Sequence, residues 1–306
     1  MKKLLRVGTR GSKLALAQTD WVVRQIRGRY PELRIEKVVI KTKGDKILDV
    51  PLAKIGGKGL FVKEIEEALL KKEIDFAVHS LKDVPSELPE GLDIVAIPKR
   101  EDPRDVFVGR GLRGLSELPE GARVGTSSLR RQAQLKRLRP DLEILPLRGN
   151  VDTRLRKLSE GRYEAIILAE AGLRRLGLAV ERTPLSPETM LPAVGQGVLA
   201  LEAREDDPET REILAVLHHR ETALCARAER AFLKRLQGGC QVPLAAYAIL
   251  RDGLLVMEGF IADTEGRRFY RERVEGPLEE SEALGIRLAE ILLEKGGREI
   301  LEELLA

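Results

Sequence analysis

The sequence predicts an α/β protein made of two lobes, followed by a small α+β domain at the C-terminus. Strand-like and helix-like segments alternate over residues 4–97 and again over 105–169, which is typical of sheets covered by helices. From residue 244 this alternation gives way to three strand-like runs in succession. Short polar turns join these runs, so we expect a three-stranded antiparallel sheet there.

In the first lobe each expected element has a local signal. Ser12 precedes an apolar helical periodicity and is a favourable N-cap, and a second helix presents Phe61, Ile65 and Leu69 on one face. Because strands joined through helices run parallel, we expect a largely parallel sheet. Its strands are expected at residues 4–7, 35–40, 74–79 and 92–97.

The second lobe follows a charged, proline-bearing break at residues 99–103. Its turn 124–128 repeats the turn 8–12, with a glycine, hydroxyl residues and then a helix start. Backbone N–H groups and hydroxyls at a helix N-terminus bind anions, although Ser and Thr are also ordinary N-caps. The other elements are expected as strands at 105–108, 143–147 and 165–169, and as helices through residue 139 and over 152–158.

The last segment is expected to open with an amphipathic helix over residues 221–236, in which Cys225 faces the core with Phe232. Strands should follow at 244–250, 254–261 and 268–274, and one helix should run from about residue 278 to the end.

Basic charge is concentrated in the middle of the chain. The whole chain has 53 Lys and Arg against 49 Asp and Glu, but residues 123–175 have 13 against 6, and 11 of these 13 are arginine. The planar guanidinium binds carboxylate or phosphate through two parallel hydrogen bonds, so this excess predicts binding of defined anionic groups. The simpler interpretation, solvated helix faces, accounts for Lys136, Arg137, Arg139 and Lys157.

Other features exclude several classes of site. His79, His218 and His219 lack the spacing of zinc ligands, so we expect no metal, and neither a phosphate-loop motif nor a serine triad is found. The chain has two cysteines, no signal peptide and no apolar run of about 20 residues, which predicts a reduced, cytoplasmic protein.

Cys240 lies in the turn GGCQVP, residues 238–243, before the first strand of the last segment. Glycine ends the preceding helix and Pro243 prevents its continuation, so the thiol is expected at the tip of a tight turn. Two interpretations stay open on these residues alone. The thiol is either reactive or a small buried apolar group, which is the commoner fate of a free cysteine.

A second candidate is the segment HSLKDVP, residues 79–85, at the carboxyl end of an apolar strand. Open α/β sheets bind their ligands at this end, so Asp83 would be a carboxylate directed at a cleft with Lys82 beside it. The alternative is an ordinary charged junction before a proline, since exposed charged pairs are common.

Eight motifs in order cover nearly the whole chain, and together they are specific although each alone is weak. They are GTRxS with LALAQ (8–18), TKGD (42–45), GKGLF (57–61), HSLKDVP (79–85), GTSSLRR (125–131), RGNVxTR (148–154), PAVGQG (192–197) and GGCQVP (238–243). With these motifs the chain closely resembles the hydroxymethylbilane synthases, or porphobilinogen deaminases, of tetrapyrrole biosynthesis.

The resemblance implies a three-domain monomer with two periplasmic-binding-protein-like α/β lobes. The first lobe would span residues 1–98 and be completed by a return segment, 196–217. The second lobe would span 99–195, and the C-terminal domain, 218–306, would carry the cofactor cysteine.

The implied reaction joins four porphobilinogen molecules head to tail with loss of ammonia, and hydrolysis then releases 1-hydroxymethylbilane. A dipyrromethane cofactor, made from two substrate units, would be bound to Cys240 through a thioether. Loss of ammonia leaves a cationic methylene-pyrrolenine. Asp83 would be the catalytic residue that stabilises it, by accepting hydrogen bonds from the pyrrole N–H.

Each ring of substrate and cofactor brings an acetate and a propionate, which the arginines would bind. The resemblance implies that Lys82, Asp83, Thr126, Ser127, Ser128, Arg130, Arg131 and Cys240 hold the cofactor. The residues implied for the substrate are Arg10, Ser12, Gln18, Phe61, Arg148, Arg154 and Arg175.

Two other classes of protein share some of these features. A non-catalytic two-lobe solute-binding or ligand-sensing protein fits two similar lobes, but it does not explain the Cys240 turn. A nucleic-acid-binding protein fits the basic middle third, but aromatic residues for base stacking make up only 4% of the chain. We therefore expect porphobilinogen as the partner, with no nucleic acid and no membrane.

Overall fold

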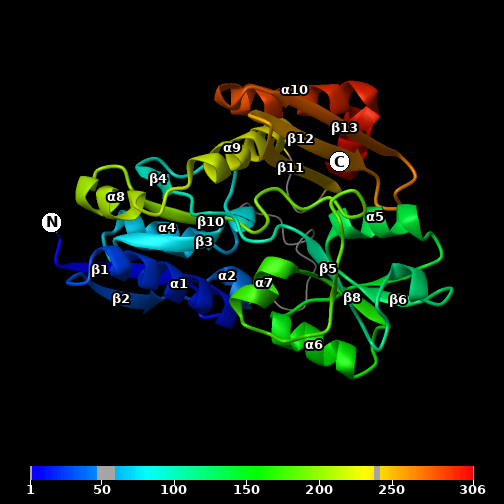
Figure 1. Cartoon of the computed structure of the whole chain (residues 1–306), viewed down its shortest axis with the longest axis horizontal. Helices are drawn as coiled ribbons and strands as arrows, with labels where there is room; N and C mark the ends of the chain where they lie inside the picture. Colours follow the sequence, from blue (N-terminus) through cyan, green and yellow to red (C-terminus); the bar gives the residue numbers. More distant parts are fainter. Residues whose placement is uncertain (1, 47–58, 238–241, 306) are drawn as a thin grey trace. The chain divides into compact units, whose positions relative to one another are not determined.

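The computed structural model describes residues 2–46, 59–237 and 242–305, which fold into two compact units (Figure 1). The first unit contains the described residues up to 101 together with 197–223. The second contains residues 102–196 and the described residues from 224 onward. Each unit is thus assembled from segments that are distant in the sequence.

The first unit has a five-stranded sheet with the strand order β2-β1-β3-β10-β4. β1 pairs in parallel with β2 and β3, whereas β10 runs antiparallel to both β3 and β4. The strands are β1 (Leu4–Thr9), β2 (Arg34–Val39), β3 (Phe76–Ser80), β4 (Leu92–Ala96) and β10 (Leu199–Arg204).

The expectation of a largely parallel sheet is wrong for this strand β10. The four strands formed by the first hundred residues do run in one direction, because β3 and β4 both oppose β10. Alternating strands and helices predict the direction of strands that follow one another in the chain. They carry no information about a strand that enters from a distant segment.

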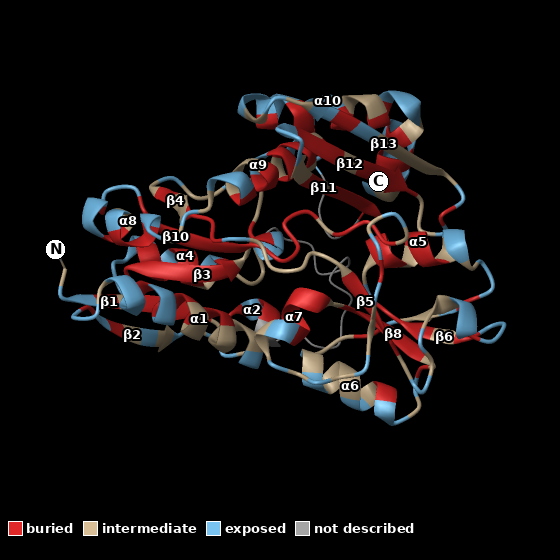
Figure 2. Cartoon of the chain, viewed as in Figure 1, coloured by how far each residue is buried: buried red, intermediate tan, exposed pale blue. Residues whose placement is uncertain are grey.

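Helices cover both faces of this sheet, and their buried sides meet buried strands (Figure 2). Phe76 and Val78 of β3 pack in the core on the α1 side, whereas Ala77 packs in the core on the α4 side. Because side chains alternate along a strand, His79 shares the α4 side with Ala77. The helices are α1 (Lys13–Arg29), α2 (Lys43–Lys46), α4 (Lys63–Leu70), the 3₁₀ turn η1 (Leu81–Asp83) and α8 (Pro208–Ala215).

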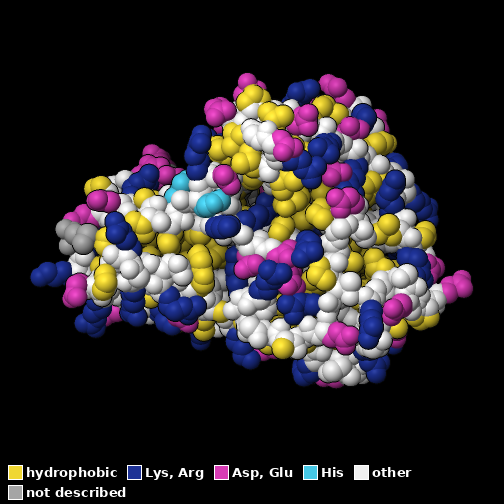
Figure 3. All heavy atoms as spheres, viewed as in Figure 1, with side chains coloured by type: hydrophobic (Ala, Val, Ile, Leu, Met, Phe, Trp, Pro, Cys, Tyr) yellow, Lys and Arg dark blue, Asp and Glu magenta, His cyan; other side chains and the backbone are white. Residues whose placement is uncertain are grey.

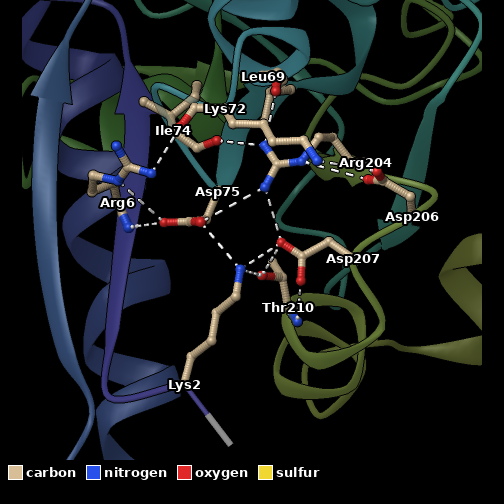
Figure 4. Close-up of polar contacts among 10 residues, drawn as sticks. All are labelled: Lys2, Arg6, Leu69, Lys72, Ile74, Asp75, Arg204, Asp206, Asp207 and Thr210. Atoms are coloured by element: carbon tan, nitrogen blue, oxygen red, sulfur yellow. Dashed lines mark hydrogen bonds and ion pairs between the residues drawn. The ribbon is translucent and has the colours of Figure 1, made fainter.

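Charged side chains anchor β10 at the edge where β3 begins (Figure 4). Arg204 donates to the backbone carbonyl of Leu69 in α4 at 2.8 Å and to that of Ile74 before β3 at 2.7 Å, and its Nη2 lies 3.0 Å from Asp207 Oδ2. Lys2 Nζ contacts Asp75 at 3.1 Å and Asp207 at 2.5 Å. These contacts tie the start of the chain, β3 and β10 together at the edge away from Ser80.

The second unit contains a five-stranded sheet of the same mixed kind, with the order β7-β6-β8-β5-β9. β6 is parallel to β7 and β8, and β5 is antiparallel to β8 and β9. The strands are β5 (Asp105–Gly109), β6 (Arg123–Gly125), β7 (Glu143–Leu145), β8 (Ala165–Ala169) and β9 (Thr183–Pro184). The helices are η2 (Leu115–Glu117), α5 (Leu129–Leu138), α6 (Val151–Ser159) and α7 (Glu170–Arg175).

The same unit ends in the expected three-stranded antiparallel sheet, β11 (Leu244–Arg251), β12 (Leu254–Ala262) and β13 (Phe269–Gly276). Phe232, Met257 and Leu288 lie in its core, and Cys225 is buried there as expected. The helices are α9 (Arg220–Arg235), η3 (Leu278–Glu280), α10 (Ser281–Leu292), the π-helical turn η4 (Leu293–Gly297) and α11 (Arg298–Leu305).

The expectation of a single C-terminal helix is wrong, because the helix is interrupted at Gly296. This glycine has a φ of 114°, and a Cβ there would come within 2.6 Å of the Tyr270 hydroxyl. Only glycine adopts this conformation at little cost. The predicted fold class, two α/β lobes followed by an α+β domain, is confirmed. Over the described ranges, no helix is both long and apolar enough to cross a membrane.

Candidate active site

A pocket opens in the first unit at the carboxyl end of β3. Its walls come from β3, from the N-terminal turns of α1 and from the residues that lead into α4. Five of the predicted site residues lie in it together, although they are scattered over the first 83 positions of the sequence. They are Arg10, Ser12, Gln18, Phe61 and Asp83.

Asp83 is exposed at this pocket because its neighbours are anchored. The chain leaves β3 at Ser80 and enters the turn η1, where Leu81 and Val84 are buried. Leu81 N donates to Val198 O at 2.9 Å, and Val84 N donates to Leu81 O at 3.1 Å. The buried residues on either side hold the exposed carboxylate in place. Lys82 is exposed in the same turn, but it does not line the pocket.

Polar side chains at the start of α1 and just before it also line the pocket. Ser12 caps the helix by accepting from Ala15 N at 3.2 Å, as expected. Gln18 is buried and donates its Nε2 to Ser80 Oγ at 2.9 Å, which fixes α1 against the end of β3. The guanidinium of Arg10 stacks over the Phe61 ring at 4.2 Å, so its cation is held at the pocket.

In the second unit, the turn before α5 is organised by its own hydroxyl groups. Ser128 accepts from Arg131 N at 3.4 Å as the N-cap of α5, and its own N–H donates to Thr126 Oγ1 at 3.1 Å. Ser127 Oγ accepts from Leu147 N at 2.9 Å and donates to Leu147 O at 3.1 Å. The three hydroxyls therefore shape the turn 126–128 in this structure.

Arg130 and Arg131 are buried and share one carboxylate that none of the sequence motifs contains. Asp105 accepts from Arg130 Nη1 and from Arg131 Nη2, both at 2.7 Å, and from Gln196 Nε2 at 2.9 Å. Burial alone would raise the pKa of Asp105, but the two guanidiniums hold it well below its usual range. The sequence does contain a signal for this pairing: an acidic residue, Asp105, stands at the start of an apolar strand, and the chain has an adjacent pair of arginines.

Arg131 also takes part in a cluster of positive charge with Arg148 and Arg154. Burial, and then the charges of Arg131 and Arg148, lower the pKa of Arg154 to about 10. Arg154 Nε donates to Gly149 O at 2.8 Å, and Arg131 Nε is buried with no hydrogen-bond partner among the described residues. Burial is the larger cause of this lowered pKa, and a bound anion would relieve the repulsion between Arg154 and its two neighbouring cations.

Many other basic residues of the middle third are neutralised. Arg123 pairs with Glu164, Arg139 pairs with Asp141, and Arg162 pairs with Glu160. On the face drawn in Figure 3, acidic and basic side chains are interspersed in the same way. In contrast to these surface pairs, Arg131 is buried and pairs with Asp105, and Arg154 has two cations, Arg131 and Arg148, as neighbours. Arg175, the last residue of α7, is half-buried.

Cys240 lies outside the described residues. The donor set in the described part of the second unit fits a dipyrromethane: a buried unpartnered guanidinium nitrogen and three mutually repelling arginines suit a ligand with several carboxylates. Across the described ranges, no group of three or more His, Cys, Asp or Glu is arranged to hold a metal ion.

Comparisons with known proteins agree with the eight motifs. Residues 5–212 match the family model "Porphobilinogen deaminase, dipyromethane cofactor binding domain", and residues 223–294 match "Porphobilinogen deaminase, C-terminal domain". The porphobilinogen deaminases of Geobacter sulfurreducens and Syntrophotalea carbinolica are 56% and 57% identical to this chain. Each alignment covers 98% of the chain, with 94% and 96% of the respective relatives.

Solved structures with weaker similarity include a methionine binding protein, at 15% identity and a TM-score of 0.43, covering 70% of this chain and 89% of that one. The family models and the relatives confirm the resemblance that the motifs gave, including its dipyrromethane cofactor and its transferase class. The chain belongs to the porphobilinogen deaminase family.

Proposed function

We propose that this chain is a hydroxymethylbilane synthase in which Asp83 is the catalytic residue. It condenses four porphobilinogen molecules with loss of ammonia and releases 1-hydroxymethylbilane by hydrolysis. The observation that carries the assignment of Asp83 is the pocket at the end of β3, where this carboxylate lies with Arg10, Ser12, Gln18 and Phe61. A non-catalytic solute-binding role is not favoured, because the chain matches the enzyme family over nearly its whole length.

The pocket suits the charges of the substrate. Porphobilinogen carries a cationic aminomethyl group and two carboxylates, and the pocket offers an exposed carboxylate, Asp83, and a stacked cation, Arg10. As the C–N bond breaks and ammonia leaves, positive charge spreads over the pyrrole ring. Asp83 accepts a hydrogen bond from the ring N–H and stabilises this charge, which lowers the barrier.

Arg10 and Ser12 bind a carboxylate of the same ring. Phe61 holds Arg10 by stacking, and Gln18 fixes α1 against the end of β3 through Ser80. In the second unit, Arg131, Arg148 and Arg154 bind further acetate and propionate groups. Arg175 and the turn 126–128 take part in the same binding. Arg130 contributes by neutralising Asp105, and Lys82 adds a cation to the turn of Asp83.

Cys240 is the proposed attachment point of the dipyrromethane. When bound, the cofactor supplies a permanent primer with a free pyrrole end, to which the first substrate ring is joined. The arginines of the second unit hold its carboxylates. Because a thioether is not cleaved by hydrolysis under these conditions, the same primer serves every round of synthesis.

Intact-mass analysis of the purified active enzyme tests this attachment. We expect a mass above that of the polypeptide by one dipyrrole, and we expect Cys240→Ser to lack both the added mass and the activity. Cys225→Ser is the matched control, since Cys225 is buried in the core away from solvent, and it should keep the adduct. Active enzyme with the bare polypeptide mass would contradict the proposal.

The arginine cluster makes a separate prediction. Arg154→Gln should lower kcat/KM by about 10- to 100-fold, the worth of one charge-assisted hydrogen bond. Arg156→Gln is the matched control, because Arg156 lies on the same helix but is exposed and pairs with Glu160. Steady-state kinetics should show a near-normal rate for the control. Equal rates in the two variants would remove Arg154 from the binding site.

The proposal also covers the location, the oligomeric state and the domain division of the enzyme. We place the enzyme in the cytoplasm as a monomer that acts on a small molecule and does not bind nucleic acid. Its three domains would be 1–98 with 196–217, 99–195, and 218–306. The insertion of β10 into the first sheet and the separate C-terminal sheet both support this division.

A further inference from the structure

Three ionisable side chains are buried together on the α4 side of β3, behind the pocket. His79 lies on β3, Glu202 on the neighbouring strand β10 and Glu66 on α4. His79 Nε2 is 2.8 Å from Glu202 Oε2, and the three residues are 5%, 1% and 7% exposed. His79 also lines the pocket that contains Asp83, and so does Val62, one helical turn before Glu66. The cluster therefore adjoins the reaction site.

The cluster lowers the stability of the folded state, which suggests that it has a function. Glu66 Oε1 and Glu202 Oε1 are buried and have no hydrogen-bond partner among the described residues. A buried carboxylate oxygen without a donor destabilises the folded state, and apolar side chains of similar size would be more stable there. Groups that are costly and lie beside a pocket are candidates for a functional role.

The charges around Glu66 make its ionisation sensitive to pH near neutrality. Burial, followed by the negative charge of Glu202, raises the pKa of Glu66 to about 7, while His79 and Lys63 act in the opposite direction. The other charged residues on the strands that α4 contacts are already paired: Arg6 with Asp75, Asp93 with Arg211, and Arg204 with Asp207. Glu66 is thus neutral in mild acid and negative above neutral pH.

We propose that Glu66, Glu202 and His79 form a charge-setting group that makes the pocket of Asp83 more negative when Glu66 ionises. This inference rests on the proposed function. The negative charge stabilises the cation that forms on the substrate as ammonia leaves, and it does so through the poorly polarisable interior rather than by contact. His79 and Glu202 are positioning residues, because their mutual hydrogen bond holds the Glu202 charge against β3 next to the pocket.

The same ionisation should have opposite effects on catalysis and on stability. Because the pKa of Glu66 is raised by folding, its contribution to stability is present at acid pH and is lost as pH rises through about 7. Catalysis should instead increase over this interval, as the charge appears. A residue with only a structural role would change stability and activity in the same direction.

The test compares wild type with Glu66→Gln, which keeps the shape of the side chain but cannot ionise. Over a pH range that brackets 7, wild-type kcat should rise with pH at nearly constant KM, whereas kcat of the variant should stay flat. At the alkaline end the variant should be about tenfold slower, the size expected of one buried charge near the site. Urea unfolding should show that the variant no longer loses stability over this interval.

Two further variants complete the experiment. Glu66→Asp keeps a carboxylate and should retain a rise of kcat with pH. Glu67→Gln makes the same chemical change at the next, exposed position of α4 and should behave as wild type. A pH-dependent rise that persists in Glu66→Gln would overturn the inference, as would a loss of activity and stability together at every pH. The Glu66→Gln enzyme should still carry its covalent dipyrrole, so failure here is distinguishable from failure of the proposed function.

Discussion

Asp83→Asn should abolish measurable turnover while the fold and the attached cofactor remain. The amide keeps the size of the carboxylate and one acceptor oxygen, but it lacks the negative charge that stabilises the cationic substrate. Removing one well-placed stabilising group of this kind costs about 10²- to 10³-fold in kcat, and losing a full charge should cost at least that much. Steady-state assays, intact-mass analysis and circular dichroism together measure the three properties.

Asp20→Asn provides the matched control for this change. Asp20 lies on α1 and pairs with Lys37 at 2.6 Å on the surface, away from the pocket residues. This variant should retain wild-type turnover. Near-normal turnover in Asp83→Asn itself would remove Asp83 from the mechanism, whatever its place in the pocket.

Asp105→Asn should destabilise the second unit by about 3–5 kcal/mol, the range for breaking a buried ion pair from one side. Asp105 is fully buried and is the shared partner of two buried guanidiniums, so its neutral analogue leaves both cations without compensation. The pKa of Asp105 is lowered by these arginines, so its contribution is present at neutral pH and is lost only in strong acid. Urea unfolding at neutral pH measures the difference.

The surface offers a close comparison for this second change. Asp141 also accepts from an arginine, with Arg139 Nη2 at 2.7 Å, but solvent reaches both side chains. Asp141→Asn should therefore leave the unfolding midpoint nearly unchanged. If both variants unfolded at the same urea concentration, burial would not be the reason for the importance of Asp105.

Local signals predicted most elements of the fold. Ser12 and Ser128 do cap their helices, and the three C-terminal strands pair as expected, because caps and short turns depend on residues close in sequence. The mixed direction of the sheets was missed, since β10 and β5 take their neighbours from distant segments. The break at Gly296 was missed for a similar reason, because Tyr270 of a neighbouring strand occupies the space beside it.

The candidate site shows the same limit. The motifs identified Arg10, Gln18 and Asp83, and the structure brings them into one pocket. Spacing in the sequence could not show that Arg130 and Arg131 are bound to a buried carboxylate, because Asp105 lies 25 and 26 positions before them. It also could not show that two glutamates in apolar surroundings approach a histidine.

The place of β10 in the first sheet has a consequence for synthesis of the protein on the ribosome. β3 and β4 are not neighbours, and each forms its ladder with β10, which begins only at Leu199. A nascent chain that has not yet reached this residue presents two open strand edges, and such edges are the ones that pair with other chains. The unit that contains Asp83 is therefore completed only after the whole of the second lobe has been translated, and truncated chains ending before Leu199 should be prone to aggregation.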